Sequence, residues 1–422
     1  MRWSMPNPIL EIIDTIKFII DEFFRSSKRF WLALAGLGII TVYGLYLWFF
    51  VQHGIVLFGF EEGGMIYTAM SDSVIWGMYI SFFIFWVGVA AAGIVFGIAA
   101  YVFNVPSFKK VAVIGEAQAV MALIIALQLV IVDIGRPIRA LLLMPLLPNL
   151  RSMFDWDFLV LTSYLILNLI GYLYTVNMYR QDRGLPKRFT NIFITIAAPL
   201  AIGIHTVTAF ISQPLTARPI WNSPLLAPRY VATAFASGPA ILLMTVYLAS
   251  KNIDEFEVDF ELYKKTLYVI VASLVVGMYF TLTEVQELFW YTTEPSKFLQ
   301  ANTLIFGKDL PWIGYLFWGW VILGIIAILM PIASSYYRNT VNGIMAVCIL
   351  TVIAVIFEKT FTIVLPAFLP DTLGLRVGYY PTPLEIFITL GIHGLGIIIF
   401  MILAKAAIRA IIIHYKPGVE HH

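Results

Sequence analysis

Ten apolar runs divide the chain at nearly regular intervals. Each run has about 20 residues or more, the length at which a helix crosses roughly 30 Å of hydrocarbon. They cover approximately residues 31–51, 74–103, 111–132, 157–179, 189–212, 229–250, 264–290, 312–335, 340–366 and 384–413. The pattern predicts an all-α polytopic membrane protein with one transmembrane domain over residues 31–414.

The first 30 residues follow a different pattern. Charged side chains interrupt the apolar positions at helical spacing, namely Glu11, Asp14, Lys17, Asp21 and Arg25. This spacing predicts an amphipathic helix at the cytoplasmic membrane interface rather than a signal peptide. A cytosolic helix docked on a partner protein has the same pattern and stays open as an alternative.

Lys and Arg are unevenly divided between the two sets of connections. Eighteen lie in the N-terminal segment, in alternate connections and at the C-terminal end, whereas eight lie in the opposite connections: Arg136, Arg139, Arg151, Arg218, Arg229, Lys297, Lys308 and Arg376. Positive residues near short loops are retained in the cytoplasm. The count therefore predicts a multi-pass protein of the cytoplasmic membrane with both termini in the cytoplasm, where residues 415–422 form a tail.

Composition and the absence of certain sequence motifs exclude several classes of function. The chain is 60% hydrophobic and 12% charged, with a net charge of +2 and a mean hydropathy of +0.87. No basic tract suits nucleic acid, and no phosphate-binding glycine loop or nucleophile elbow occurs. Cys348 cannot by itself anchor an iron–sulfur cluster. Only His205 and His393 lie well inside the runs, so we expect no intrinsic haem, and metal centres would belong to partners.

Ionisable residues inside apolar runs or at their ends cost free energy to insert into hydrocarbon, and are therefore candidates for function. The segment from residue 115 to residue 139 carries Glu116 at the cytoplasmic end of the third run and Asp133, Arg136 and Arg139 at its outer end. Acids at both faces of one helix are the layout that a proton path needs. Alternatively, Asp133 pairs with Arg136 or Arg139 and fixes the loop.

The fourth run opens with a second carboxylate at the same membrane depth. Asp157 is flanked by Trp156 and followed by Tyr164. Two carboxylates near one interface can accept protons from a quinol while aromatic side chains enclose its ring. In the alternative interpretation, Asp157 is only the N-cap of the helix.

Other polar residues lie deeper. His205 in the fifth run is a helix-packing or a proton-relay residue, and Glu284 in the seventh run is either a proton carrier or a solvated charge near the outer loop. Glu358 and Lys359 are adjacent in the ninth run, so they leave the helix in different directions. Each is expected to find a partner on another helix.

Several strings together resemble one family. WGMYISFFIFWVGVAAAG from Trp76, VDIGRPIR, the Trp156–Asp157 pair, IHTVTAF from Ile204 and LAPRYVATAFASGPAIL from Leu226 resemble the NrfD/PsrC family, the quinone-interacting membrane subunits of respiratory complexes. Within it the chain looks most like the DsrP branch of DsrMKJOP complexes. The resemblance implies two four-helix bundles, spans two to five and six to nine, flanked by spans one and ten.

The resemblance also implies the chemistry. A menaquinone or related quinone would bind near the extracytoplasmic face of the first bundle, at Trp76, Asp133, Arg136, Arg139, Trp156, Asp157 and Tyr164. Asp133 occupies a position where some relatives have histidine. Proton transfer in the family would make Asp133, Asp157, Glu116, His205 and Glu284 the proton-handling residues.

Partners follow from the same resemblance. The expected ones are a ferredoxin-like multi-cluster iron–sulfur subunit on the extracytoplasmic face (DsrO-like), a multihaem cytochrome c (DsrJ-like), and a membrane and cytoplasmic module (DsrM/DsrK-like), besides lipids. The connection from Gln213 to Arg229, QPLTARPIWNSPLLAPR, is rich in Pro and aromatic residues and suits such docking.

The resulting hypothesis is a haem-free quinone-interacting subunit linked to sulfur or sulfite metabolism, redox-active only within its complex. Two alternatives remain. One is a secondary transporter or proton channel, although no obviously broken pair of helices marks a midplane substrate site. The other is a structural anchor for redox partners.

Overall fold

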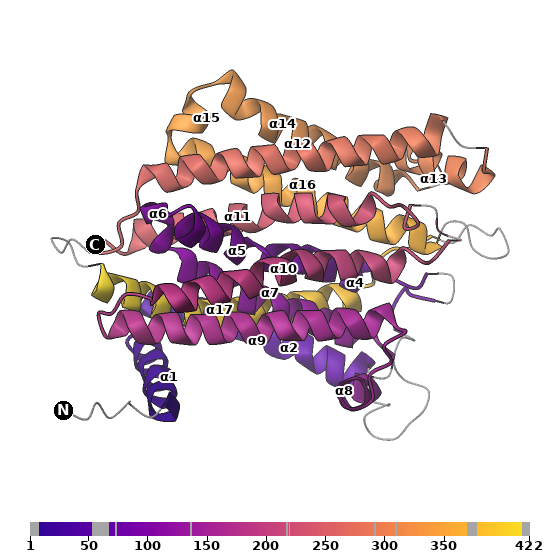
Figure 1. Cartoon of the computed structure of the whole chain (residues 1–422). Helices are drawn as coiled ribbons and strands as arrows, with labels where there is room; N and C mark the ends of the chain where they lie inside the picture. The colour runs from indigo at the N-terminus through magenta and orange to yellow at the C-terminus, as the bar shows by residue number, and fades with distance from the viewer. Residues whose placement is uncertain are drawn as a thin grey trace, which may run out of the picture.

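The computed structural model describes residues 8–52, 67–71, 74–135, 137–216, 218, 220–290, 293–308, 310–368 and 378–415. Within them, ten helices are long and apolar enough to cross a membrane, which confirms the ten predicted spans to within a few residues. In Figure 1 the long helices lie roughly parallel, with the short helix α8 at one end of the bundle and α1 and the C-terminus at the other. These are called the α8 end and the α1 end.

Two groups of four spans pack as helix bundles. The first contains α4 (Met78–Ala90) with α5 (Ala92–Gly97) and η2 (Ile98–Val102), α7 (Ala112–Asp133), α9 (Met153–Arg180) and α10 (Lys187–Ser212). The second contains α11 (Leu226–Asn252), α12 (Phe260–Trp290), α14 (Pro311–Ala333) and α16 (Val341–Phe368). α11 and α16 pack on α4, so the two bundles share one buried interface.

The first and last spans lie together rather than on opposite sides. α2 (Lys28–Tyr46, continued by η1, Leu47–Gln52) packs on α17 (Pro383–His414), and α17 packs on α7 and α9 of the first bundle. Gly44 and Gly391 allow this contact, because a Cβ atom on either would lie 2.6 Å from the Cα of the other. Small residues let helix backbones approach in lipid, where packing holds helices together.

Shorter helices complete the two ends of the structure. α8 (Pro137–Leu146) and α13 (Pro295–Phe306) lie at the α8 end, and α6 (Pro106–Lys109) and α15 (Tyr336–Asn339) lie at the α1 end (Figure 1). α1 (Pro8–Phe24) leaves the bundle at a steep angle to the spans. Among the described residues, helices are the regular secondary structure throughout.

The second span is interrupted within its run of small residues. α4 ends at Ala90, α5 begins at Ala92, and the Ala91 N–H bonds to the Gly88 carbonyl (3.3 Å). From the sequence we found no obviously broken pair of helices, and this single interruption does not make a pair. Beyond the interruption, Gly93 packs on α7, since a Cβ there would lie 2.9 Å from the Gly115 carbonyl oxygen. α11, which holds the matching place in the second bundle, includes Pro239 and is continuous.

Candidate functional site

Two apolar recesses lie side by side at the α8 end of the first bundle. The outer recess lies between α7, α8 and α9, has about 20 Å³ of free space, and its wall includes Leu127, Ile131 and Phe158. The inner recess has about 30 Å³ of free space and is lined by Trp76, α4, α10 and Ile363 of α16. Both are almost entirely apolar, which suits the ring and tail of a lipid-soluble molecule.

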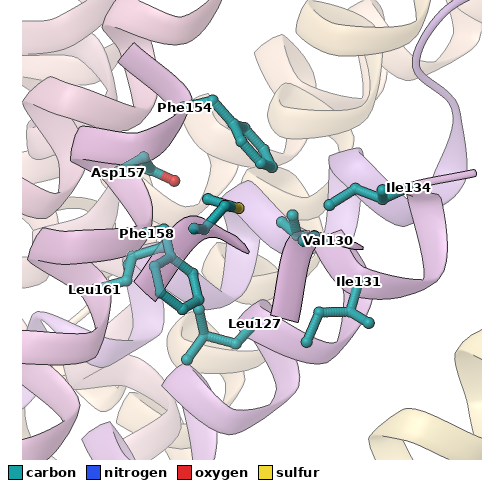
Figure 2. Close-up of a pocket in the computed structure, with 10 residues that line it drawn as sticks. Leu127, Val130, Ile131, Ile134, Phe154, Asp157, Phe158 and Leu161 are labelled. Atoms are coloured by element: carbon teal, nitrogen blue, oxygen red, sulfur yellow. The ribbon is translucent and has the colours of Figure 1, made fainter. Parts of the chain in front are cut away.

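Asp157 supplies the acid group of the outer recess. Figure 2 shows its carboxyl turned toward the recess, with Phe154 above and Val130 across from it. The side chain is 2% exposed and accepts a hydrogen bond from Thr208 Oγ1 (2.6 Å). The N-cap alternative is wrong, because Ser152 caps α9 by accepting from the Asp155 N–H (3.3 Å), one turn before Asp157.

Thr208 connects the two recesses. It lines the inner recess while its hydroxyl group bonds to Asp157 in the outer one. The same oxygen lies 2.6 Å from the Ile204 carbonyl oxygen, one turn earlier in α10. A hydroxyl carries one proton, so it donates to one of these two oxygens at a time.

Trp76 forms an aromatic wall of the inner recess. Its ring centroid is 4.7 Å from that of Trp221, and the planes are inclined by 48°. Trp221 is fully buried and donates through Nε1 to the Thr362 carbonyl (2.9 Å). The Trp76 ring is therefore backed by a side chain that is itself fixed.

Two aromatic residues of the predicted site lie elsewhere. Trp156 is 37% exposed and its Nε1 donates to the Leu150 carbonyl (2.9 Å), so its ring lies on the outside of α9. Tyr164 is buried two turns beyond Asp157 and lines a small recess with Glu116 and Asn168. Neither side chain borders the two recesses.

Asp133 and Asp157 lie at the same end of the bundle but in different environments. The α7 residues that line the outer recess are Leu127, Val130 and Ile131, with Ile134 at the helix end. Asp133 belongs to another face of α7 and lies within electrostatic range of Glu385. Arg136 lies outside the described residues, and Arg139 lies in α8 with a side chain outside the described part, so their predicted roles stay predictions.

Glu385 organises the polar region near Asp133. It is fully buried, accepts from the Thr382 N–H (2.8 Å) in a capping box, and accepts from the Tyr379 hydroxyl (2.7 Å). Burial and the Glu385 carboxylate raise the pKa of Tyr379, so this hydroxyl stays protonated and donates. The Met78 N–H in turn donates to the Tyr379 oxygen (2.9 Å). Glu385 therefore ties the starts of α4 and α17 together.

Glu116 and His205 are buried at separate places. The Glu116 carboxyl faces Thr175 of α9, in a recess that also includes Tyr101 and Asn168. His205 is 1% exposed, and its ring bonds to the Ala201 carbonyl. A Cβ atom on Gly88 would lie 3.5 Å from His205 Nε2 and 3.6 Å from the Cα of Ala234 in α11, so the ring lies beside the contact between the two bundles.

Glu284 is part of a buried ionic cluster, which we define as Arg229 of α11, Glu284 of α12, and Glu358 and Lys359 of α16. Arg229 pairs with Glu284 through Nη1 and with Glu358 through Nε (3.1 Å). Lys359 pairs with Glu358 (2.9 Å) and donates to Thr233 of α11 (2.7 Å). The expectation of partners on another helix is confirmed, but the adjacent Glu358 and Lys359 also pair with each other.

The ionic cluster corrects two interpretations. Glu284 is 4% exposed and paired, so it is not a solvated charge near a loop. Arg229 was assigned to an outer connection, yet it lies in the first turn of α11 and is 1% exposed. An arginine followed at once by an apolar helical run is the signal that marks it as part of the span.

His393 is engaged at both ring nitrogens. Trp86 Nε1 donates to Nε2 (2.7 Å), and Nδ1 lies 2.7 Å from the Thr389 carbonyl oxygen. Nδ1 therefore carries the proton, and the Nε2 lone pair is occupied. Iron ligation by this ring would require loss of the Trp86 bond.

An all-helical membrane domain with a carboxylate between apolar recesses defines a class of membrane proteins suited to lipid-soluble substrates. Residues 67–369 match the family described as polysulphide reductase, NrfD, and the chain belongs to this family. It is 28% identical to a protein of Halobacterium salinarum assigned as a dimethyl sulfoxide reductase membrane subunit, over 90% of this chain and 91% of that protein.

Two further relatives are more distant. A selenate reductase subunit of Mesobacillus selenatarsenatis is 23% identical over 80% of this chain and 87% of that protein. The Hdr-like menaquinol oxidoreductase integral membrane subunit of Archaeoglobus fulgidus is 22% identical over 80% of this chain and 86% of that protein. The chain is thus a membrane subunit of the kind found in multi-subunit reductases and oxidoreductases.

Proposed function

We propose that the chain is the quinone-reacting membrane subunit of a redox complex, with the reacting ring held between Trp76 and the Asp157–Thr208 pair. The observation that carries this proposal is the hydrogen bond from Thr208 to Asp157, which joins two apolar recesses. A buried carboxylate beside an apolar recess is suited to take a proton from a quinol hydroxyl.

The proposed reaction releases two electrons and two protons as a quinol becomes a quinone. The electrons pass to an iron–sulfur subunit docked at the α8 end. Asp157 receives the first proton and, after passing it on along the polar face of α9, receives the second. Menaquinone is the proposed quinone, consistent with the menaquinol named for the Archaeoglobus relative. The reverse reaction uses the same groups.

The docking surface is supported by the connection before α11. Trp221 and Ile220 are buried, and the Ile220 N–H donates to Gln300 (3.3 Å). Asn222 donates to the Gln213 carbonyl (2.7 Å) and so ties the ends of the turn together. A preorganised surface loses little entropy when a partner binds.

The DsrO-like, DsrJ-like and DsrM/DsrK-like partners and the link to sulfur metabolism rest on the resemblance to the DsrP branch.

Proton transfer is the second proposed activity, and α9 supplies the observation that favours it. One buried face of this helix carries Asp157, Tyr164, Asn168, Thr175 and Tyr179 in steps of four or seven residues. Glu116 of α7 faces the middle of that stripe. Polar groups inside a bundle are costly unless they serve a path or pair with each other. This stripe leads from Asp157 toward the α1 end.

A redox role accounts for the site better than transport or anchoring. A structural anchor does not need a carboxylate between two apolar recesses. A transporter site at the membrane midplane is expected at paired helix breaks, whereas only one span is broken mid-way among the described residues. Family membership also favours the redox role.

A binding measurement tests the proposed function. A short-tailed naphthoquinone should quench tryptophan fluorescence of the detergent-solubilised chain saturably, at a concentration on the order of micromolar. Trp76→Phe should remove most of the saturable part, because this ring lines the inner recess. Trp156→Phe is the matched control, since Trp156 lies outside both recesses. Equal loss in both variants would mean that the quencher acts from the micelle.

We also propose that α1 lies in the cytoplasmic membrane interface. The side of α1 turned toward the protein includes Thr15, which donates to Asn177 of α9 (3.1 Å), and Lys405 of α17 donates to Ser26 just beyond the helix (2.6 Å). Ile16, Ile20 and other apolar side chains are exposed. An exposed apolar face beside exposed charged residues such as Lys17 suits a helix that lies in the membrane interface.

Cysteine labelling tests this position. In a Cys348→Ala background, a fluorophore on Ile16→Cys should be quenched by lipids that carry a quencher in the acyl chain. A fluorophore on Lys17→Cys should respond less, because Lys17 is exposed on the charged face. In intact cells, Lys17→Cys should resist a membrane-impermeant maleimide if the N-terminus is cytoplasmic. Lipid quenching at neither position would favour a docked cytosolic partner.

A further inference from the structure

Phe154 and Val130 are the two residues that line both recesses. Phe154 lies in the first turn of α9, one turn before Asp157, and Val130 lies near the end of α7. In Figure 2 the Phe154 ring projects over the outer recess, opposite Val130. These two side chains therefore form the partition between the recesses.

Both recesses combine buried and half-buried side chains. Leu127, Ile131 and Phe158 of the outer recess are half-buried, as are Trp76 and Ile211 of the inner one. A molecule that moves from one recess to the other passes the partition.

Asp157 and Thr208 are placed on the two sides of this partition. The carboxylate is in the outer compartment, the hydroxyl is in the inner one, and their hydrogen bond of 2.6 Å crosses between them. A ring that has passed the partition meets the Thr208 hydroxyl. A ring that has not passed it meets only the carboxylate and apolar side chains.

The free space in each recess is smaller than a quinone ring. It is about 20 Å³ in the outer recess and about 30 Å³ in the inner one, whereas ligand sites occupy roughly 300–1,000 Å³. An isoprenoid quinone therefore enters only if lining side chains turn aside. Phe154 borders both recesses, so rotation of its ring enlarges both of them.

We propose that Phe154 is the gate of a two-compartment site for an isoprenoid quinone, with the ring bound in the inner recess and the tail held in the outer one. This inference rests on the proposed function. Phe154 is a positioning residue, since it controls passage and residence, while the ring in the inner recess contacts Thr208, which is hydrogen-bonded to Asp157. Rotation of one aromatic side chain about χ1 is the motion required.

A size series at residue 154 tests the gate in the purified complex. Phe154→Trp should slow quinol binding about tenfold, and Phe154→Ala should speed both binding and release about tenfold, as expected for a gating step. The measurement is stopped-flow binding with a long-tailed naphthoquinol. Leu159→Trp places a tryptophan on the lipid-facing side of α9, where Leu159 is 50% exposed, and should leave both rates within about twofold.

A tail-less naphthoquinol separates the two compartments. It leaves the outer recess empty once bound, so Phe154→Ala should shorten its residence less than that of the long-tailed quinol. Unchanged binding and release rates in Phe154→Ala, with normal binding to the native complex, would overturn the gate and leave the proposed function standing. If the native complex binds neither quinol, the proposed function itself fails. Phe154→Ala decides the question even if Phe154→Trp does not assemble.

Discussion

Asp157→Asn is expected to reduce quinol-dependent reduction of the iron–sulfur partner by about 10² or more. Asparagine keeps the size of the side chain and can still accept the hydrogen bond from Thr208, but it cannot take up the quinol proton. Fold and quinone binding should therefore persist while turnover is lost. Initial rates at saturating quinol, together with naphthoquinone affinity, measure the two effects separately.

Two other buried carboxylates serve as controls for this variant. Asp133→Asn and Glu116→Gln also neutralise acids of the first bundle, but neither side chain lines the two recesses. Both variants should keep the rate of electron transfer in the detergent-solubilised complex within a few-fold of native. The surroundings of a carboxyl group, rather than its residue type, decide its role. In vesicles, Glu116→Gln should lower proton movement if the α9 stripe is a path. A large loss in Asp133→Asn with a native rate in Asp157→Asn would move the site to the Glu385 side of α7.

Arg229→Met is expected to destabilise the protein by about 3–5 kcal/mol, because it leaves Glu284 and Glu358 buried with one positive charge between them. The ionic cluster holds two positive and two negative groups, each at most 4% exposed, on three helices of the second bundle. Removing one member strands a charge in a medium that cannot solvate it. The expected readout is a much shorter half-life of the solubilised chain at elevated temperature.

An exposed ion pair provides the matched control. Lys265 pairs with Glu261 four residues earlier on α12 (2.8 Å), with side chains 49% and 64% exposed. Lys265→Met should leave the half-life of the solubilised chain close to native, because water screens such pairs. Arg229→Lys should be intermediate, since it keeps the charge but loses the planar fork that contacts two carboxylates. Equal half-lives for Arg229→Met and Lys265→Met would show that the ionic cluster does not hold the second bundle together.

The spans were predictable because hydrocarbon thickness fixes the length of an apolar helix. All ten runs correspond to helices, and their ends differ by a few residues where caps decide the start. α9, for example, begins at Met153 after the Ser152 cap, although the apolar run starts at residue 157. Cap residues are polar, so a search for apolar runs leaves them out.

The candidate site was predictable only in part. Trp76 and Asp157 are 81 positions apart in the printed sequence and line neighbouring recesses. Trp156 is adjacent to Asp157 but points outward, because successive residues on a helix are rotated by about 100°. The same rotation turns Asp133 away from the recess that Ile134 lines. The approximate depth of a residue in the membrane follows from its position along an apolar run. The direction in which its side chain points depends instead on how the helix is rotated against its neighbours.

The order of residues alone was enough to establish the class of protein, the number of spans and the family. Which of those residues meet became known only from the packed helices: Asp157 with Thr208, Glu385 with Tyr379, and Arg229 with Glu284 and Glu358. Burial in lipid depends on the composition of one segment. A hydrogen bond or ion pair between spans depends instead on packing and helix rotation, which are properties of the assembled bundle.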